Sequence, residues 1–239
     1  MTIKTAFLVC AGMGTRMKPL TDTCPKPLLP LNGRPLLEYI FDHLRKTNVD
    51  KVTVNSHYLA SQITSYLQTI EDFAMTESFE PVLLETGGGL VKALDTLGKE
   101  PFLMINGDAF WIDQKGHNTL KELESEFDPL KMDILLCLIP VTRMILTEGV
   151  GDYDFLPDGR LCRNLKKNGT HMFTGIRIIN PEILSGYRVE KFSFLEIMDQ
   201  AEKNGRLYGY PLKGDWHHIS TPEDLISVQN HLEPDRSKR

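Results

Sequence analysis

Apolar runs and amphipathic segments alternate along the first half of the chain. Short apolar runs predict buried strands at residues 6–9, 51–55, 82–84 and 102–105. Apolar side chains spaced three and four apart predict helices at residues 35–46, 58–70 and 90–97. Strands that alternate with helices are typical of parallel sheets. We therefore predict an α/β fold, with a Rossmann-like, mostly parallel sheet and helices on both of its faces.

The second half of the chain has longer strand-like runs and fewer helices. The turn sequence at residues 157–159 separates two short runs, which predicts a hairpin. Thr221, followed by Pro222 and Asp224, predicts the start of the last helix. The polar tail at residues 233–239 is expected to fray. The other predicted segments are strands at 133–141, 172–180 and 206–212 and a helix at 192–204.

Four loops rich in glycine or polar residues follow the predicted strands of the first half. They lie at residues 11–26, 55–57, 85–89 and 106–108. The carboxyl ends of parallel strands meet at one edge of a sheet, and ligands of such sheets bind beyond that edge. We therefore expect these four loops to lie together and to form a ligand site.

The first of these loops has the features of a polyphosphate site. Gly12 and Gly14 leave backbone N–H groups accessible to an anion. Arg16 adds a forked cation suited to phosphate oxygens, and Lys26, held between two prolines, adds a localised positive charge. No glycine is followed by Lys-Ser or Lys-Thr, which excludes a P-loop, and Met17 stands where a dinucleotide fingerprint needs its third glycine. The alternative is a strand-to-loop turn that binds nothing.

The composition is that of an ordinary globular protein. The chain has 239 residues and a net charge of −5 at pH 7, so it lacks the positive charge typical of nucleic-acid-binding proteins. Its four cysteines have neither metal-ligand nor redox-motif spacing. The apolar run at residues 134–141 is too short to span a bilayer, and no secretory leader pattern is present. We expect a cytoplasmic monomer or homodimer without nucleic-acid or membrane partners.

The first loop also matches a family pattern. Residues 11–30 read as a small residue, Gly-x-Gly-Thr-Arg-Met-x-Pro-Leu-Thr and then Pro-Lys-Pro-Leu-x-Pro. This order resembles the signature loop of the sugar-1-phosphate nucleotidyltransferases, which join a nucleoside triphosphate (NTP) to a sugar 1-phosphate and release pyrophosphate. The resemblance implies that Arg16 contacts the β- and γ-phosphates and that Lys26 lies near the α-phosphate.

No internal repeat or linker interrupts the chain, so we predict a single domain over residues 1–239. Its first part, about residues 1–130, would bind the nucleotide, and its second part, about residues 131–232, would bind the sugar phosphate.

The resemblance implies further contacts with the nucleotide. Gly88 would contact the base, because the family's glycine-rich loop lies against it. Three glycines at the start of a helix permit close approach, and their amides would face outward. The alternative is that this Glu-Thr-Gly-Gly-Gly run is only a flexible turn. The other nucleotide contacts implied are Ala11, Gly12, Gly14, Thr15 and Asn106.

A metal ion is expected at the end of the fourth predicted strand. Asp108 ends an Asn-Gly-Asp sequence and could hold Mg²⁺, with Mn²⁺ as an alternative. The family's usual second ligand is an aspartate two residues after a tryptophan, but here His218 occupies that position and Ser220 replaces a glycine. Imidazole suits softer ions than Mg²⁺. Either His218 ligates, or Asp215 reaches the ion, or Asp108 acts with water alone. The two adjacent histidines could also be a structural pair without a metal.

The second half supplies the sugar-phosphate contacts that the resemblance implies. Gly151, Lys166 and Thr174 stand at the matching positions. The family often has Glu-Lys-Pro where this chain has Leu-Lys-Lys at residues 165–167, so the glutamate that binds a sugar hydroxyl is missing or supplied elsewhere. A solvated surface lysine is the alternative reading of Lys166.

The glycine run at residues 85–89 and the Val-Asn-Ser-His sequence at residues 54–57 are similar to those of bacterial enzymes of peptidoglycan recycling. Those enzymes uridylylate N-acetylmuramate 1-phosphate. We therefore expect UTP and N-acetylmuramate 1-phosphate as substrates. The alternatives are a guanylyltransferase for mannose 1-phosphate, a uridylyl- or thymidylyltransferase for glucose 1-phosphate, and a non-catalytic sensor of nucleotide sugars.

Overall fold

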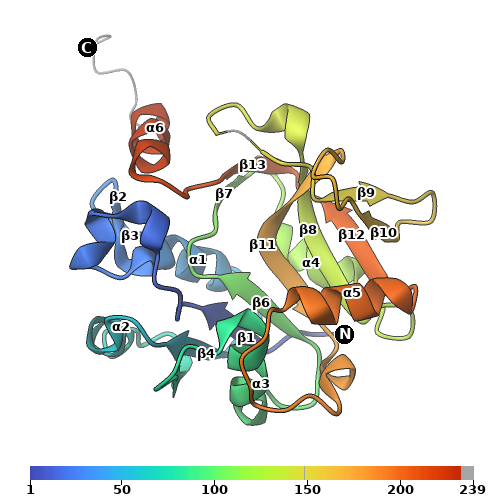
Figure 1. Cartoon of the computed structure of the whole chain (residues 1–239), viewed down its shortest axis with the longest axis horizontal. Coiled ribbons are helices and arrows are strands. Elements are labelled where there is room, and N and C mark those ends of the chain that lie inside the picture. The colour runs from blue at the N-terminus through green and yellow to red at the C-terminus, as the bar shows by residue number, and fades with distance from the viewer. Residues whose placement is uncertain (148, 233–239) are drawn as a thin grey trace.

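The computed structural model describes residues 1–147 and 149–232, so the predicted fraying of the tail at residues 233–239 lies outside the described part. The centre of the molecule is a nine-stranded mixed sheet (Figure 1). Four parallel strands from the first half of the chain form one side of it. In spatial order they are β6 (Phe102–Asn106), β1 (Thr5–Val9), β4 (Lys51–Ser56) and β5 (Ala74–Phe79).

Strands from the second half extend the sheet beyond β6. The long strand β11 (His171–Ile179) pairs antiparallel with β6, and β8 (Ile134–Pro140) pairs antiparallel with β11. The predicted hairpin is confirmed as β9 (Tyr153–Phe155) and β10 (Leu161–Arg163), and β12 (Leu207–Pro211) lies parallel to β8.

Two small antiparallel pairs lie outside the main sheet, and the sequence did not predict them. They are β2 (Pro30–Leu31) with β3 (Arg34–Pro35), and β7 (Phe110–Asp113) with β13 (Gly214–His217).

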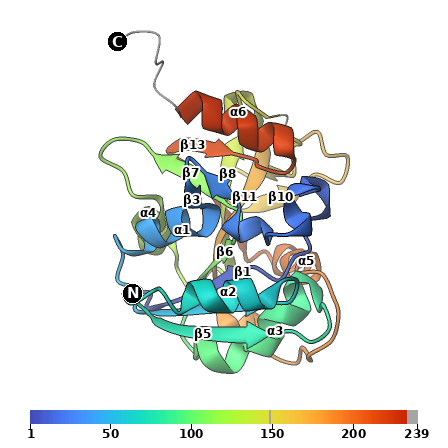
Figure 2. The same cartoon turned by 90° about the vertical axis from the view of Figure 1, so that its left-hand side faces the viewer.

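Helices cover both faces of the sheet, as predicted. One face packs against α1 (Leu36–Leu44), α2 (Ala60–Leu67) and α4 (Thr119–Glu126). The other face packs against α3 (Glu85–Leu97) and α5 (Leu195–Lys203). The last helix, α6 (Pro222–Leu232), packs instead on the signature loop and lies on the same side of the molecule as β7 and β13 (Figure 2). Within the described residues, each helix is too short or too polar to cross a bilayer.

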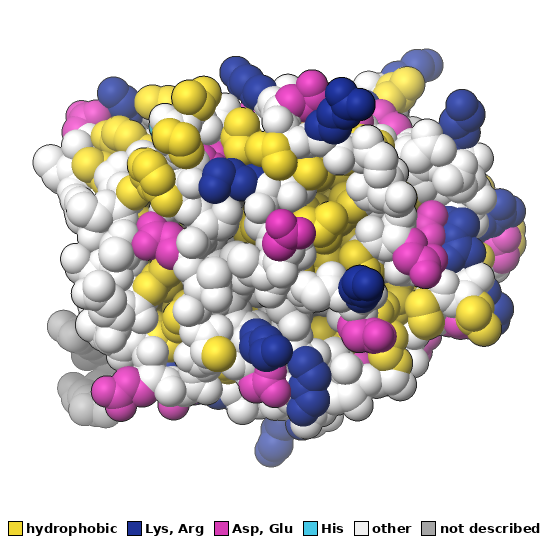
Figure 3. Space-filling view, turned by 90° about the horizontal axis from the view of Figure 1, so that it is seen from below, with side chains coloured by type: hydrophobic (Ala, Val, Ile, Leu, Met, Phe, Trp, Pro, Cys, Tyr) yellow, Lys and Arg dark blue, Asp and Glu magenta, His cyan; other side chains and the backbone are white. Residues whose placement is uncertain are grey.

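On the face seen in Figure 3, positive and negative side chains are interspersed among apolar ones. That face therefore carries no extended surface of a single charge.

The predicted strand at residues 82–84 is wrong. These residues form a loop, and the edge strand is β5, in which three of the six side chains are polar and all but one are at least partly exposed. Because an edge strand needs no continuous apolar run, a prediction based on such runs did not find β5. Helix α3 also begins earlier than predicted, at Glu85, and its first turns contain the three glycines.

The predicted start of the last helix is confirmed. The Asp224 backbone N–H donates to Thr221 Oγ1 at 3.3 Å. In return, Asp224 Oδ2 accepts hydrogen bonds from the backbone N–H groups of Ser220 at 2.8 Å and Thr221 at 2.9 Å. This reciprocal capping fixes the entry to α6 next to the signature loop.

Candidate active site

The loops that follow β1 and β6 touch each other through a glycine. The Gly107 N–H donates to the Val9 carbonyl at 2.9 Å. A Cβ atom on Gly107 would lie 2.5 Å from Cys10 Sγ, so a larger residue would push the two loops apart. This close approach brings Asp108, the next residue, beside the signature loop.

The signature loop folds as three short 3₁₀ turns anchored by buried side chains. The first, Thr15–Met17, inserts Met17 into a buried cluster with α6 and leaves Arg16 exposed. Gly14 adopts a left-handed conformation at φ +60°, which favours glycine. The Thr21 hydroxyl donates to the Gly14 carbonyl at 2.9 Å and closes the turn. The loop therefore holds Arg16 at a defined place while leaving its guanidinium accessible.

Lys26 and Asp108 form the central ion pair of the site. Lys26 Nζ lies 2.5 Å from Asp108 Oδ2. The Lys26 side chain is 11% exposed and that of Asp108 37%, so the lysine is the more deeply buried partner of the pair. In contrast, Arg16 forms no ion pair with any described residue.

A buried network beneath the loop ties four chain segments together. Asn55, at the end of β4, accepts a hydrogen bond from the Cys10 N–H at 2.7 Å and donates to Glu80 at 2.7 Å. The other oxygen of Glu80 accepts from the Leu84 N–H at 2.9 Å, just before α3. A Cβ atom on Gly89 would lie 2.4 Å from Glu80 Oε1, so this glycine leaves room for the carboxylate. The four loops predicted to lie together are thus joined at one edge of the sheet.

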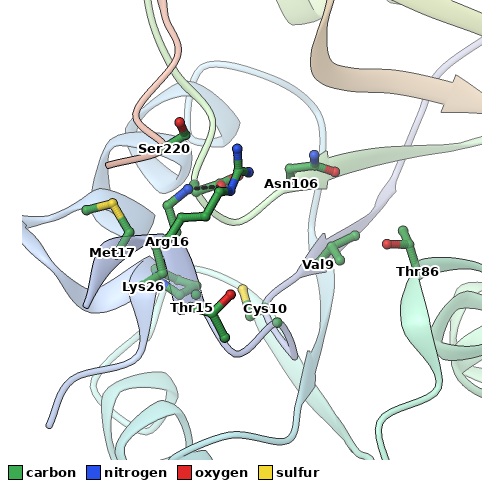
Figure 4. Close-up of a pocket in the computed structure, with 13 residues that line it drawn as sticks. Val9, Cys10, Thr15, Arg16, Met17, Lys26, Thr86, Asn106 and Ser220 are labelled. Carbon is green, nitrogen blue, oxygen red and sulfur yellow. Dashed lines mark hydrogen bonds and ion pairs between the residues drawn. The ribbon is translucent and has the colours of Figure 1, made fainter. Parts of the chain in front are cut away.

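A first cavity opens above the signature loop (Figure 4). Its walls include Thr86 from α3 and Ser220, which precedes α6. The predicted site residues that line it are Gly12, Gly14, Thr15, Arg16, Lys26, Asn106 and Asp108.

Cys10 also lines this cavity, but it is not activated as a nucleophile. Burial, and then the charge of Asp108, raises the pKa of its thiol well above the usual range. The thiol is therefore protonated at neutral pH, when the thiolate would be the nucleophile.

A second cavity adjoins the first on the side of β11 and β13. Thr174 and Gly175 of β11 line it together with Trp216 and His218. Arg16, Asn106 and Asp108 line both cavities. Two ligands could therefore occupy separate cavities and meet at these three residues.

The second cavity places His218 where it could assist Asp108 in holding a metal ion. Its ring stacks on Trp216, with centroids 5.5 Å apart. Burial, and then the positive charge of Lys26, lowers the pKa of His218, so its imidazole is neutral and able to ligate at neutral pH. Asp215, in contrast, is exposed, pairs with Arg143 at 3.9 Å and lines neither cavity.

These residues fit a shared metal site rather than a complete protein cage. Within residues 1–147 and 149–232 there is no group of three or more possible side-chain ligands. One or two side-chain ligands are sufficient for Mg²⁺ when substrate phosphates and water complete its coordination.

Comparisons with known proteins identify the family of the chain. The family model for nucleotidyl transferases matches residues 5–143, more than half of the chain. The chain belongs to the nucleotidyl transferase family. This confirms the predicted enzyme class and the resemblance seen in the signature loop.

Individual relatives of this nucleotidyl transferase act on different sugars and bases. The chain is 31% identical over 235 residues to the N-acetylmuramate α-1-phosphate uridylyltransferase of Caulobacter vibrioides, covering 96% of this chain and 97% of the relative. It is 26% identical to the D-glycero-α-D-manno-heptose 1-phosphate guanylyltransferase of Aneurinibacillus thermoaerophilus, covering 95% and 98%. The UDP-glucose pyrophosphorylase of Acinetobacter baumannii has the same fold, with a TM-score of 0.80, 17% identity and coverage of 99% and 95%.

Four residues predicted for the site of this nucleotidyl transferase line neither cavity. Ala11 is buried beside the signature loop. Gly88 is buried, and its N–H donates to the Phe192 carbonyl at 3.3 Å, so the prediction that this amide faces outward is wrong. A Cβ atom on Gly88 would lie 1.9 Å from the Glu190 carbonyl oxygen, which shows that the glycine serves packing.

The other two flank the hairpin of β9 and β10, with Gly151 before it and Lys166 after it. Gly151 packs against Gly169, whose carbonyl oxygen would lie 1.8 Å from a Cβ atom. Lys166 is exposed in the turn after β10. Thr174 does line the second cavity, and its hydroxyl donates to the Cys137 carbonyl at 2.8 Å.

Sequence reasoning missed Thr86 and Ser220 as cavity residues. Thr86 stands in the glycine run that was singled out, but the glycines and not the threonine were taken as the ligand contacts. Ser220 was noted only as a departure from the family's metal motif. Their hydroxyl groups give the first cavity two hydrogen-bonding groups beyond those predicted.

Proposed function

We propose that this nucleotidyl transferase transfers a uridylyl group from UTP to N-acetylmuramate 1-phosphate, giving UDP-N-acetylmuramate and pyrophosphate. A reaction between two substrates is supported by the pair of adjoining cavities that share Arg16, Asn106 and Asp108. The choice of substrates is supported by the 31% identity to the Caulobacter uridylyltransferase, which extends over nearly the whole of both chains.

In this reaction, a phosphate oxygen of the sugar 1-phosphate attacks the α-phosphorus of UTP. The new P–O bond forms as the bond to the β-phosphate oxygen breaks, and pyrophosphate leaves on the opposite side. Both reactants are anions, so positioning and charge neutralisation supply most of the catalysis. Arg16 would neutralise the β- and γ-phosphates, and Lys26 would lie by the α-phosphate, where the two anions meet.

Enzymes of this family generally use a divalent metal ion. We propose that Asp108 holds Mg²⁺, or alternatively Mn²⁺, with His218 as a second ligand from the facing wall. The ion would supply further neutralisation of the phosphate charge. The exposed edge of the Asp108 carboxylate and the neutral imidazole of His218 support this assignment.

The first cavity would bind the nucleotide through the signature loop, Thr86 and Asn106. The second would bind the sugar phosphate, with Thr174 on its wall. Ala11, Gly88, Gly151 and Lys166 are left out of the proposed contact set because they line neither cavity. We further propose that the protein is a cytoplasmic monomer or homodimer acting in peptidoglycan recycling.

The test is pyrophosphate release from UTP and N-acetylmuramate 1-phosphate, in Mg²⁺ and separately in Mn²⁺. N-acetylglucosamine 1-phosphate and GTP serve as the matched alternative substrates. We expect turnover with the proposed pair and markedly less with either replacement. Faster turnover of GTP, or of a sugar phosphate without the lactyl group, would contradict the proposed substrates and retain the enzyme class. UTP binding without turnover in either metal would favour a sensor.

A further inference from the structure

A buried arginine lies directly behind the wall between the two cavities. Arg177 is in β11, where the pairing with β8 shifts register between Phe173 and Arg177. The residue is only 1% exposed. Its guanidinium carbon lies 4.6 Å from the centroid of the Phe194 ring and 5.3 Å from that of Phe173. The cation is thus held between two aromatic side chains.

No carboxylate compensates this buried charge within the part of the chain that the structure describes. Arg177 forms no salt bridge there, and its Nε atom has no hydrogen-bond partner. Burial lowers the pKa of Arg177 to about 9, so the guanidinium is still protonated at neutral pH. Removing a cation from water without a paired anion is costly, and an apolar side chain would fill the same space at a lower cost.

The hydrogen bonds of Arg177 connect it to the active site. Its Nη1 donates to Asn106 Oδ1 at 3.1 Å and to the Gly175 carbonyl at 3.4 Å. A guanidinium has only donors, so the oxygen of the Asn106 amide must face it. The amide nitrogen, Nδ2, is then left without a hydrogen bond to any described residue.

Gly175 makes room for this arrangement. It adopts φ +84°, and a Cβ atom there would lie 2.9 Å from Asn106 Nδ2. Asn106 lines both cavities, and Figure 4 shows its amide on the wall of the first. The Asn106 side chain is therefore held from behind by two residues of β11.

We propose that Arg177 is a positioning residue that fixes the orientation of the Asn106 amide. With Oδ1 bound to Arg177, both N–H bonds of Nδ2 are available to a phosphate oxygen where the two cavities meet. This role rests on the proposed function for its substrates, but the orientation of the amide is a property of the free protein.

The kinetic test compares Arg177→Met with Arg177→Lys. Methionine fills the space without charge or donors, whereas lysine keeps the charge and N–H donors on a single nitrogen. We expect kcat/KM to fall about 10- to 100-fold in R177M, as for other residues that orient a ligand-binding group, and to recover in part in R177K. R177M should unfold at the same temperature or higher, because a buried charge has been removed.

Arg206→Met is the matched control. Arg206 immediately precedes β12, at the end of the sheet away from the two cavities, and its Nε is 2.7 Å from Asp133 Oδ1. R206M should lose stability and keep its turnover at a temperature where it is folded. Wild-type kcat/KM in R177M would overturn the proposal.

A double-mutant cycle separates action through Asn106 from any other route. In an Asn106→Ala background, R177M should change kcat/KM less than about twofold, because the group it orients is absent. An effect of the same size in both backgrounds would overturn the proposal.

A spectroscopic test needs no substrate. In protein labelled with ¹⁵N-asparagine, the Asn106 side-chain NH₂ signals are identified by their loss in Asn106→Ala. They should shift or broaden in R177M, and unchanged signals would overturn the proposal. If the wild type fails to use UTP and N-acetylmuramate 1-phosphate, the proposed function fails, and these signals still decide the role of Arg177.

Discussion

Lys26 Nζ lies 2.5 Å from Asp108 Oδ2, so the lysine expected to meet a phosphate is paired with the carboxylate expected to hold a metal ion. The two residues are 82 positions apart, and the absence of a side chain at Gly107 allows their loops to meet. In the free protein each charge satisfies the other. In the proposed reaction, binding of an NTP with its metal ion would exchange this pair for two new ones, lysine with phosphate and carboxylate with metal.

We predict that Lys26→Met strengthens metal binding by the free protein while weakening catalysis. Removing the lysine frees the Asp108 carboxylate, so the affinity for Mn²⁺ without nucleotide should rise, as measured by electron paramagnetic resonance. Turnover should fall about 10²–10³-fold, since a preorganised cation at the reacting phosphate is lost. Asp108→Asn serves as the opposite control and should bind Mn²⁺ more weakly than the wild type. Weaker Mn²⁺ binding in K26M would contradict this account of the pair.

Arg16→Ala should abolish most activity without affecting the fold. Arg16 is exposed and forms no ion pair with the described residues, so the unfolding temperature should stay within the error of the measurement. The rate of pyrophosphate release should fall about 10²–10³-fold. Lys18→Ala is a suitable control, because Lys18 is an exposed cation of the same loop that pairs with Asp22 at 3.1 Å and lines neither cavity. Equal activity in the two variants would reject Arg16 as a phosphate contact.

Gly12→Ala and Gly14→Ala should separate ligand binding from stability. A Cβ atom on Gly12 would meet no atom within 4 Å, so G12A should fold normally, but its methyl group would enter the first cavity. We expect KM for the NTP to rise about tenfold, from a clash of about 1–2 kcal/mol. In G14A, the left-handed backbone and a contact of 3.0 Å with Thr21 should cost about 1–2 kcal/mol of unfolding free energy. Urea titration and initial-rate kinetics measure the two effects, and an unchanged KM in G12A would argue against an NTP in this cavity.

The stability that Asp224 contributes should depend on pH. Burial tends to raise the pKa of Asp224, but the N–H groups of Ser220 and Thr221 bind its charged form and lower the pKa overall. A carboxyl whose pKa is lowered on folding stabilises the protein fully above its unfolded pKa, near 4, and loses that contribution as the pH falls through the folded value. Asp224→Ala should therefore cost about 1 kcal/mol at pH 7, and the difference from the wild type should shrink below about pH 4.

The matched control for this measurement is Glu223→Ala, an exposed acid in the same turn of α6. It should show a small effect at every pH. A difference between D224A and the wild type that stays constant down to pH 3 would contradict the capping role.

The parallel half of the fold could be predicted because strand and helix periodicities alternate clearly there. The location of the site followed from this topology, since loops after parallel strands share an edge. The edge strand β5 was missed because three polar residues in its middle interrupt any apolar run. The pair β7 and β13 was missed because its two strands are distant in the sequence.

Individual side-chain roles were harder to predict than the location of the site. In the sequence, Gly88 is compatible both with a ligand contact and with a packing position. The segment that packs against it, at Glu190 and Phe192, shows that it is a packing position. Nothing in the sequence indicates that Arg177 is buried, because a strand with a single arginine usually exposes it. Such roles depend on partners brought together by tertiary structure.

The wall shared by the two cavities has a consequence for the affinities of two ligands that bind together. Two ligands that both contacted Arg16, Asn106 and Asp108 would influence each other's binding. If the first ligand changes the affinity for the second by some factor, the second changes the affinity for the first by the same factor, because the coupling free energy between two sites is reciprocal. The affinity for either ligand measured alone would therefore differ from its affinity when the other ligand is already bound.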